Sequence, residues 1–274
     1  MAPACYIGGV IPAGAEMTQS FIRRHPMTAL PIARIEAATF TAWPAITTAM
    51  DGMWLARFAR GFTKRSNSIQ CLDPADDADA VARLRRMEDL YPLNSLDPVF
   101  RVTPLAGPGV IAALDSEGWL PFEESRVLTM AFGDGPLMPE GVEVVDGTDD
   151  RYFDALVEIA GYTRKTRDTL AAIVNLIAVR NAGILVRNGA GEPIATALAV
   201  NALGIGIYTN VITRKDKRGQ GIGRKLMQGA LAWTREVGAT HAAIQVVSDN
   251  VPAIGLYSSL GFSEAYRYHY RRPA

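Results

Sequence analysis

The feature of this sequence that most constrains its fold is a glycine-rich turn between a strand-like stretch, residues 205–213, and an amphipathic helix expected to run to about Val237. A helix start presents unpaired backbone N–H groups and a partial positive charge, and glycines let an anion approach them closely. Strand, turn and helix in this order therefore predict an α/β unit with a phosphate-binding turn. The turn consists of Arg218, Gly219, Gln220, Gly221, Ile222 and Gly223.

One known phosphate loop is excluded here and another fits poorly. A Walker loop ends in Gly-Lys-Ser/Thr, whereas Gly223 is followed by Arg224 and Lys225 with no hydroxyl after them. A Rossmann unit places its glycines directly after the strand and an acid about 20 residues further on. Five residues separate the strand from Gly219, and Gln245 stands where the acid is wanted. A third pattern, Arg/Gln-x-x-Gly-x-Gly/Ala, matches the turn.

This third pattern resembles the GNAT superfamily of N-acetyltransferases. The resemblance covers residues 142–271 and includes Asn250 and Tyr257 downstream of the turn. It implies a mixed α/β fold: a mostly antiparallel, twisted sheet flanked by helices, with a splayed central pair of strands. It also implies acetyl-CoA as co-substrate. The implied cofactor-binding residues are Val211, Ile212, Thr213, Arg218, Gly219, Gln220, Gly221, Ile222, Gly223, Arg224 and Asn250.

Within that resemblance, Tyr257 matches the general acid that protonates the leaving thiolate. It lies seven residues after Asn250, about two helical turns on, so both can face the same side. Packing on the helix face is the structural alternative for Tyr257, and capping the helix is the alternative for Asn250. No general base is assigned, because Gln245 stands where some relatives have Glu. Tyr208 and Asn210 are candidates to hold an ordered water instead.

The acceptor side is less specified. In the family it is formed by the first two helices, their loop and the last strands. Here that loop carries Tyr162, Arg164 and Arg167, which either read a carboxylate-bearing amine or are solvated surface groups. In the final strand three tyrosines alternate with charged residues, which is ordinary strand patterning or a substrate wall. These tyrosines are Tyr266, Tyr268 and Tyr270.

The chain divides by pattern into two similar halves around a Gly/Pro-rich linker, residues 133–141. We expect a leader without function at 1–26, a degenerate GNAT-like domain at 27–135 and a catalytic GNAT domain at 136–274. In the second half, strands are expected at 142–145, 184–187, 194–200, 205–213, 241–247 and 262–271, and helices at 152–160, 166–179, after the turn and after Asn250.

The first half repeats part of this pattern. Residues 112–119 and 255–262 both read as a helix that breaks at a glycine before an aromatic residue and a strand. The expected counterpart of the phosphate turn, residues 72–79, holds four aspartates and no glycine, and Leu114 stands where Tyr257 would. We therefore expect this half not to bind acetyl-CoA in the usual way. Residues 54–68 are expected to form paired strands. This segment resembles the amino-terminal half of some bacterial tandem GNAT proteins, which implies that the first half completes the substrate cleft or holds the active half in place.

Composition limits the partners. Lys plus Arg and Asp plus Glu are 28 each, so nothing favours nucleic acid or anionic lipid. The two cysteines fit a reducing cytoplasm, no His/Cys cluster has metal-ligand spacing, and no apolar run approaches the ~20 residues of a membrane span. We expect a bacterial, cytoplasmic monomer or homodimer.

The leading hypothesis is an N-acetyltransferase that moves an acetyl group from acetyl-CoA to a primary amine by direct attack in a ternary complex. The amine belongs to a small molecule, or to a peptide or protein. A non-catalytic acyl-CoA-binding or sensing module is the alternative, and the missing base is its best support. A dinucleotide-dependent oxidoreductase is the third hypothesis.

Overall fold

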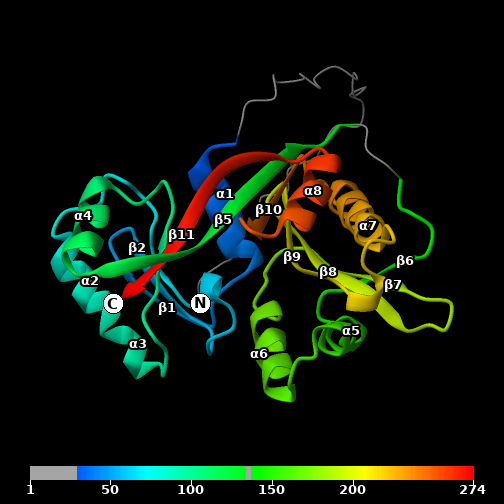
Figure 1. The fold of residues 1–274 in the computed structure, drawn as a ribbon, viewed down its shortest axis with the longest axis horizontal. Helices are drawn as coiled ribbons and strands as arrows, with labels where there is room; N and C mark the ends of the chain where they lie inside the picture. The colour runs from blue at the N-terminus through cyan, green and yellow to red at the C-terminus, as the bar shows by residue number, and fades with distance from the viewer. Residues whose placement is uncertain (1–29, 134–136) are drawn as a thin grey trace, which may run out of the picture.

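The computed structural model describes residues 30–133 and 137–274. The leader expected at 1–26 lies outside these residues. A single eleven-stranded sheet runs through the described chain in the order β1-β2-β3-β4-β11-β5-β10-β9-β8-β7-β6 (Figure 1). Most neighbours are antiparallel, and two pairs, β3 with β4 and β9 with β10, are parallel. The predicted mixed α/β fold with a mostly antiparallel sheet is confirmed.

The elements of the first half are α1 (Ile32–Ala42), β1 (Thr47–Asp51), β2 (Trp54–Phe58), the 3-10 turn η1 (Lys64–Ser66), β3 (Ile69–Cys71), α2 (Ala80–Glu88), α3 (Leu90–Leu93), β4 (Phe100–Val102), α4 (Pro108–Ser116) and β5 (Trp119–Ala131).

The elements of the second half are β6 (Val142–Asp146), α5 (Asp150–Ala160), α6 (Arg164–Val174), β7 (Asn181–Arg187), β8 (Pro193–Ala202), β9 (Ile205–Thr213), η2 (Lys215–Lys217), α7 (Ile222–Glu236), β10 (His241–Val247), α8 (Val251–Ser259) and β11 (Ser263–Pro273).

The two halves repeat one topology and exchange their last strands. In each half an antiparallel run of strands ends in a parallel pair, β3–β4 and β9–β10, and a helix, α4 or α8, then leads to a long strand. Those long strands, β5 and β11, pair antiparallel with each other at the centre (Figure 1). Each also pairs with the other half, because β5 lies against β10 and β11 against β4.

This exchange bears on how the chain divides. The boundary expected at 135/136 stays a prediction, since the sheet is continuous and β5, which precedes the boundary, sits between β10 and β11. Helix α1 crosses in the same sense: its buried residues Ile35, Ala38 and Ala42 belong to the core formed by α5, α6 and one face of the second half's sheet. The second half is therefore completed by two elements of the first.

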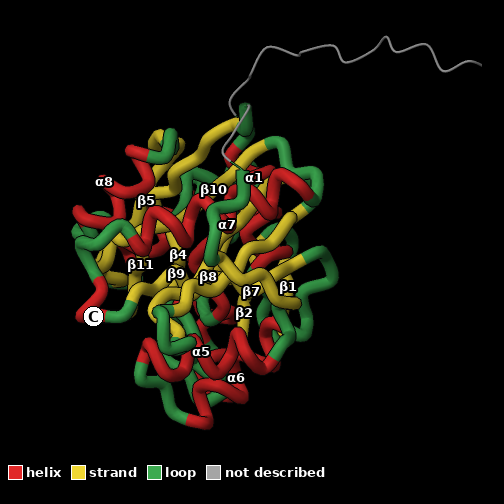
Figure 2. Tube along the Cα trace, turned by 90° about the vertical axis from the view of Figure 1, so that its right-hand side faces the viewer, coloured by secondary structure: helices red, strands yellow, loops and turns green. Residues whose placement is uncertain are grey.

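Helices cover both faces of the second half's sheet. Figure 2 shows β7 and β8 between α7 on one side and α5 on the other. Alternate residues of the strands supply the two cores: Leu185 and Leu198 face α5 and α6, whereas Ile184 and Ala197 face α7 and α8. A third core, around Trp54, Phe100 and Leu114, fills the first half.

Local sequence explains most boundaries. Asp149 and Thr163 each accept a hydrogen bond from a backbone N–H at the start of α5 and α6. The β7–β8 hairpin is closed by Asn188, whose side chain accepts from the N–H groups of Ala190 and Glu192. The strands and helices predicted in the second half are confirmed, with one correction: α6 ends at Val174 rather than Val179, because Asn175 caps it by donating to the Ala171 carbonyl.

A second correction concerns residues 54–68, which were expected to be paired strands. Only β2 is a strand there, and it pairs with β1 and β3. Residues 59–68 form a loop with the short turn η1. The Asn67 side chain explains this, because its Oδ1 accepts from the N–H groups of Ala59 and Gly61 at 2.7 and 3.0 Å and its Nδ2 donates to the Thr63 carbonyl at 2.7 Å. These bonds replace those of a strand ladder.

Candidate active site

Strands β9 and β10 separate at the centre of the sheet. Their parallel pairing runs from His241 opposite Ile205 to Ile244 opposite Tyr208 and ends there. Beyond that point β9 carries an irregularity against β8, and Asn210 adopts a φ of 50°. Residues of β9 after Tyr208 thus keep their backbone pairs with β8 but have no strand on the other edge. The predicted splayed pair is confirmed, and Val211, Ile212 and Thr213 lie on its open edge.

The glycine turn leads directly from that edge to the start of α7. Gly221 is the N-cap residue of this helix, and no side chain among the described residues caps it. Gly219 and Gly221 have φ of +73° and +78°, a region that favours glycine, and a Cβ at either position would meet open space. A Cβ at Gly223 would lie 3.4–3.5 Å from Leu256 and Thr213. The first amides of α7 are therefore unpaired and accessible.

Basic side chains surround this turn, and two of them are held in place. Arg218 donates through Nε to the Thr213 carbonyl at 3.2 Å, which folds the turn back on β9. Arg224 donates to the Ser259 hydroxyl at 2.7 Å and ties α7 to α8. Gln220 donates to the Asp216 carbonyl at 3.1 Å. Neither Arg218 nor Arg224 forms an ion pair with a described carboxylate, so the turn keeps the positive potential that attracts an anion.

Helix α8 has Asn250 at its start and Tyr257 near its end. Asn250 caps the helix, since its Oδ1 accepts from the Ala253 N–H at 3.2 Å. Tyr257 is buried, its ring packs edge-on against Phe262, and its hydroxyl makes no hydrogen bond within residues 30–133 and 137–274. Burial raises the pKa of this phenol to about 12. Its proton is therefore retained across the physiological pH range and is not committed to another residue.

The acidic counterpart in the first half is arranged differently. Residues 72–79 connect β3 to α2, the position that the glycine turn holds between β9 and α7. Asp77 accepts from the Gly109 N–H at 2.7 Å, at the start of α4, and Asp76 pairs with Arg83 at 2.8 Å. These carboxylates make the segment unfavourable for a phosphate, and the expectation that this half does not bind acetyl-CoA in the usual way stays a prediction.

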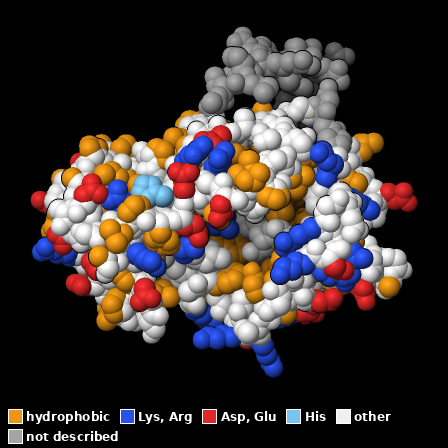
Figure 3. All heavy atoms as spheres, viewed as in Figure 1, with side chains coloured by type: hydrophobic (Ala, Val, Ile, Leu, Met, Phe, Trp, Pro, Cys, Tyr) orange, Lys and Arg blue, Asp and Glu red, His pale blue; other side chains and the backbone are white. Residues whose placement is uncertain are grey.

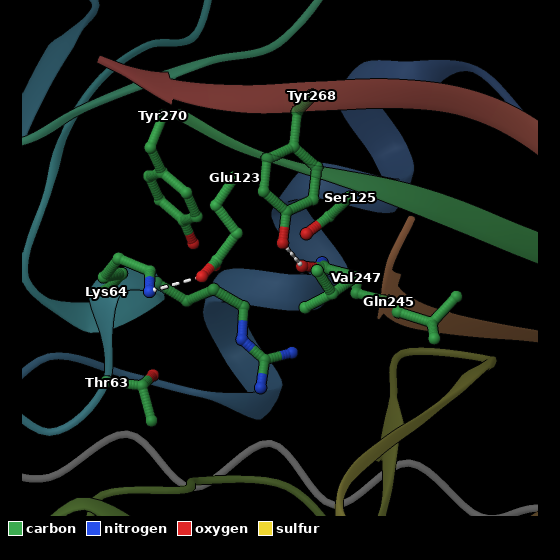
Figure 4. Close-up of a pocket in the computed structure, with 10 residues that line it drawn as sticks. Thr63, Lys64, Glu123, Ser125, Gln245, Val247, Tyr268 and Tyr270 are labelled. Atoms are coloured by element: carbon green, nitrogen blue, oxygen red, sulfur yellow. Dashed lines mark hydrogen bonds and ion pairs between the residues drawn. The ribbon is translucent and has the colours of Figure 1, made fainter. Parts of the chain in front are cut away.

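A cavity of about 200 Å³ lies beside the splayed strands, on the β10 side. Four segments line it: the loop around η1, strand β5, the end of β10 and strand β11 (Figure 4). Figure 3 shows a hollow near the middle of one face, with basic side chains along its right-hand side. The residues that line the cavity are Thr63, Lys64, Arg65, Glu123, Ser125, Gln245, Val246, Val247, Tyr268 and Tyr270.

Fixed hydrogen bonds order much of this wall. Gln245 accepts from the Tyr268 hydroxyl at 3.0 Å and donates to Thr39 of α1 at 3.0 Å, and Lys64 pairs with Glu123 at 2.8 Å (Figure 4). Tyr268 and Tyr270 line the cavity, while Tyr266 bonds to buried Glu36. All three alternating tyrosines of β11 thus lie on the same face of the sheet, and two of them, Tyr268 and Tyr270, line the cavity.

Several sequence-based candidates lie elsewhere. The buried Tyr208 hydroxyl is 2.6 Å from that of Thr234, and Asn210 donates to the Tyr152 hydroxyl while keeping its amide oxygen and a second N–H. Arg167 pairs with Asp150 at 2.7 Å and with Asp154 at 2.9 Å. Its charge therefore belongs to a surface network of ion pairs, which favours the surface interpretation over recognition of a substrate carboxylate.

The sequence did not identify which residues of the first half line this cavity. Arg65, Glu123 and Ser125 reach it only because β5 and the η1 loop cross into the second half. The sequence signal was a polar segment: residues 63–68 interrupt an otherwise apolar stretch, and Gly61 and Asn67 favour a loop there.

No helix in the described ranges has the length and apolar run to cross a membrane.

Splayed strands, an uncapped glycine turn and a duplicated sheet define the class of fold, a tandem GNAT-like fold. The model of one family, described as "Probable histone acetyltransferase Rv0428c C-terminal", matches residues 29–271, and this chain belongs to that family.

Relatives agree over most of the chain. Uncharacterized N-acetyltransferase YobR of Bacillus subtilis (strain 168) is 23% identical over 256 residues, which are 88% of this chain and 98% of the relative. A GCN5-related N-acetyltransferase from Kribbella flavida superposes with a TM-score of 0.69 at 22% identity, over 90% of this chain and 97% of that one. A tandem GNAT protein from the clavulanic acid biosynthesis pathway superposes with a TM-score of 0.59 at 15% identity, over 90% of this chain and 89% of that one. The two structural likenesses show the shared fold.

Proposed function

We propose that this acetyltransferase transfers an acetyl group from acetyl-CoA to a primary amine within a ternary complex. The observation that carries the proposal is that the open edge of β9 leads through the glycine turn to the uncapped start of α7, while the end of β10, the other separated strand, lines a cavity. An extended pantetheine arm pairs with Val211 and Thr213 as an added strand does, and the pyrophosphate takes the amides from Gly219 to Arg224. The acceptor amine enters from the cavity.

The residues of the turn fit an anionic cofactor. A Cβ at Gly219 or Gly221 would project into open space, so the backbone there is accessible to a ligand from outside. Gly223 allows α7 to start close to Thr213 and Leu256. The nearby Arg218 and Arg224 add charge without being neutralised by a carboxylate. We assign Arg218, Gln220 and Ile222 to the same cradle and Asn250 to the cofactor arm beyond it.

In this proposal Tyr257 is the general acid. Acetyl-CoA supplies an activated acyl group: the C–S bond breaks as a C–N bond forms, a proton leaves the amine nitrogen and one reaches the thiolate sulfur. Tyr257 holds that second proton on a hydroxyl without a partner in the described chain. Its raised pKa of about 12 makes transfer to a thiolate of pKa ~8.5 uphill, and contact at close range is what makes it feasible.

The acceptor is a small-molecule amine or an amine of a peptide or protein. The family description names a histone acetyltransferase, so a lysine side chain belongs among the acceptors tested. We place the reaction in the cytoplasm, without a nucleic-acid or membrane partner, in a monomer or homodimer.

The direct test is thiol release from acetyl-CoA with a panel of amines, together with calorimetric titration of acetyl-CoA into the full chain. Saturable binding with amine-dependent thiol release supports the proposal. Tight binding without release on any amine would support a non-catalytic acyl-CoA-binding module instead. Binding of NAD with none for CoA would overturn both.

A further inference from the structure

Arg65 has an unusual position in the cavity. Its half-buried side chain lines the 200 Å³ cavity and also a narrower recess formed with Thr39, Tyr208 and Gln245. That recess touches β9 at Tyr208, the residue after which the strands separate. Arg65 therefore lies between the acceptor cavity and the last paired residues of β9 and β10, next to the point where the two strands separate.

The guanidinium of Arg65 makes no hydrogen bond or ion pair with any described residue. The other cation of the cavity, Lys64, is already paired with Glu123. A guanidinium presents five N–H donors in a planar fork that matches a carboxylate in two parallel bonds. One unpaired cation in a recess, beside a neutralised pair, is complementary to a single negative charge.

The loop that carries Arg65 is built to hold it. The main-chain carbonyl of Arg65 accepts from buried Arg57 at 2.6 Å. Ser66 and Asn67 are buried and bond to the backbone of Phe62 and Thr63. Trp43 donates to the Thr63 hydroxyl at 3.2 Å. Much structure fixes the backbone of this turn while the Arg65 side chain is left without a structural partner, which is the arrangement of a preorganised binding group.

We propose that Arg65 selects acceptors that carry a carboxylate along with the reacting amine. This inference rests on the proposed acetyl transfer. The cavity is smaller than the 300–1,000 Å³ usual for drug-sized ligands, so it takes a small amino acid-like acceptor or the end of a longer one. A phosphate dianion is a poorer match, because the second cation that would balance it is held by Glu123.

The test compares ω-amino acids of two to six carbons with their amides as acceptors, by kcat/KM for thiol release. We expect the wild type to prefer the acids by about 10- to 100-fold, the range that one charged hydrogen-bonding pair gives. Arg65→Gln should bring this ratio close to one, and Arg65→Lys should restore part of it. Because the amine pKa differs between acid and amide but is the same for every variant, the change in ratio isolates the side chain.

Arg164→Gln is the matched control, since Arg164 is an exposed arginine at the start of α6 that the sequence offered for the same role. It should leave the ratio unchanged; a loss there and not at Arg65 would overturn the inference. Equal rates for acid and amide on the wild type would also overturn it, while leaving acetyl transfer intact. A preference for aminoethyl phosphate over the acids would overturn the inference, because it would show that the site recognises a phosphate rather than a carboxylate.

Binding of the same compounds by calorimetry in the presence of CoA does not depend on turnover. If no acceptor gives thiol release but the acids bind more tightly than the amides in an Arg65-dependent way, the proposed function fails and the recognition stands. If the acids and the amides bind equally or not at all, the recognition fails.

Discussion

The guanidinium of Arg57 donates to the main-chain carbonyl of Arg65, at 2.6 Å, and to that of Trp43. Arg57 is buried and has no carboxylate partner in the described chain, and burial together with nearby Arg101 lowers its pKa to about 9. A buried cation is thus used to hold the backbone of a loop that presents a second cation to the cavity. Arg57 of β2 therefore ties the loop that carries Arg65 to the core of the first half.

Replacing Arg57 with Met should loosen the loop. The two carbonyls lose this donor, which costs about 1–3 kcal/mol for each buried group, and the lost repulsion from Arg101 offsets part of it. We expect the free energy of unfolding to fall by about 1–3 kcal/mol and the acceptor KM to rise with little change in acetyl-CoA affinity. Denaturant unfolding and steady-state kinetics measure these, with exposed Arg34→Met as control. A rise in acetyl-CoA Kd equal to that in acceptor KM would contradict the assignment.

Replacing Tyr257 with Phe separates chemistry from packing. The ring and its contact with Phe262 remain, and the lost hydroxyl has no partner in the described residues, so stability should change by less than about 0.5 kcal/mol. If this phenol is the acid, kcat should fall by about 10²- to 10⁴-fold at unchanged acetyl-CoA affinity. Since its pKa is raised to about 12, the wild-type kcat should show no decline from loss of this proton below about pH 11. An unchanged kcat in the variant would remove Tyr257 from the mechanism.

How much of this could be predicted follows from how local each feature is. The turn from Arg218 to Gly223, the cap at Asn250 and the position of Tyr257 depend on residues close together in the chain, and the structure has each on the expected element. The β7–β8 hairpin is equally local, because Asn188 closes it by its own side chain.

The remainder depends on pairing between distant segments. Nothing in residues 119–131 alone indicates that β5 lies between β10 and β11 rather than in its own half. The cavity inherits this difficulty, since Arg65, Glu123 and Gln245 meet only through that exchange. The conformation of residues 59–68 was mistaken because the polar side chain of Asn67 satisfies backbone groups that a strand would otherwise pair.

Substituting Gly221 with Asp tests the turn as an anion site. The residue has a φ of +78° and open space at its Cβ, so a carboxylate would stand where the pyrophosphate is proposed to bind. We expect acetyl-CoA affinity to fall by more than about tenfold, a modest change for a like charge at close range. Gly191→Asp is the matched control, because Gly191 has a φ of +82°, equally open space and a place in the β7–β8 hairpin. Thermal unfolding should show similar stability losses in both variants, and titration calorimetry should show a loss of acetyl-CoA affinity only in Gly221→Asp. Equal acetyl-CoA affinities of the two variants would refute the assignment.

Asp76 predicts a pH-dependent difference in the first half. Its hydrogen bond with Arg83 and that from the Met53 N–H lower the pKa of this carboxyl to about 2. A depressed carboxyl pKa stabilises the fold above the ordinary value near 3.9, and this stability is lost as pH falls through about 2. Asp76→Asn should therefore lower Tm at pH 7, and the gap to wild type should close near pH 2. Asp97→Asn, at an exposed site, is the control, and a gap that persists at pH 2 would contradict the linkage.

The most demanding prediction concerns Glu36, which joins the two halves. On α1, this buried carboxylate pairs with Arg101 of β4 and accepts from Tyr266 of β11. Both side chains of the pair are at most 2% exposed, so Glu36→Gln leaves the Arg101 charge without compensation in the interior. We expect a loss of about 3–5 kcal/mol in the free energy of unfolding, as measured with denaturant. Glu117→Gln, which breaks a surface pair with Arg85, should cost far less. Similar losses in the two variants would show that water reaches the Glu36 site and that the halves are not held together there.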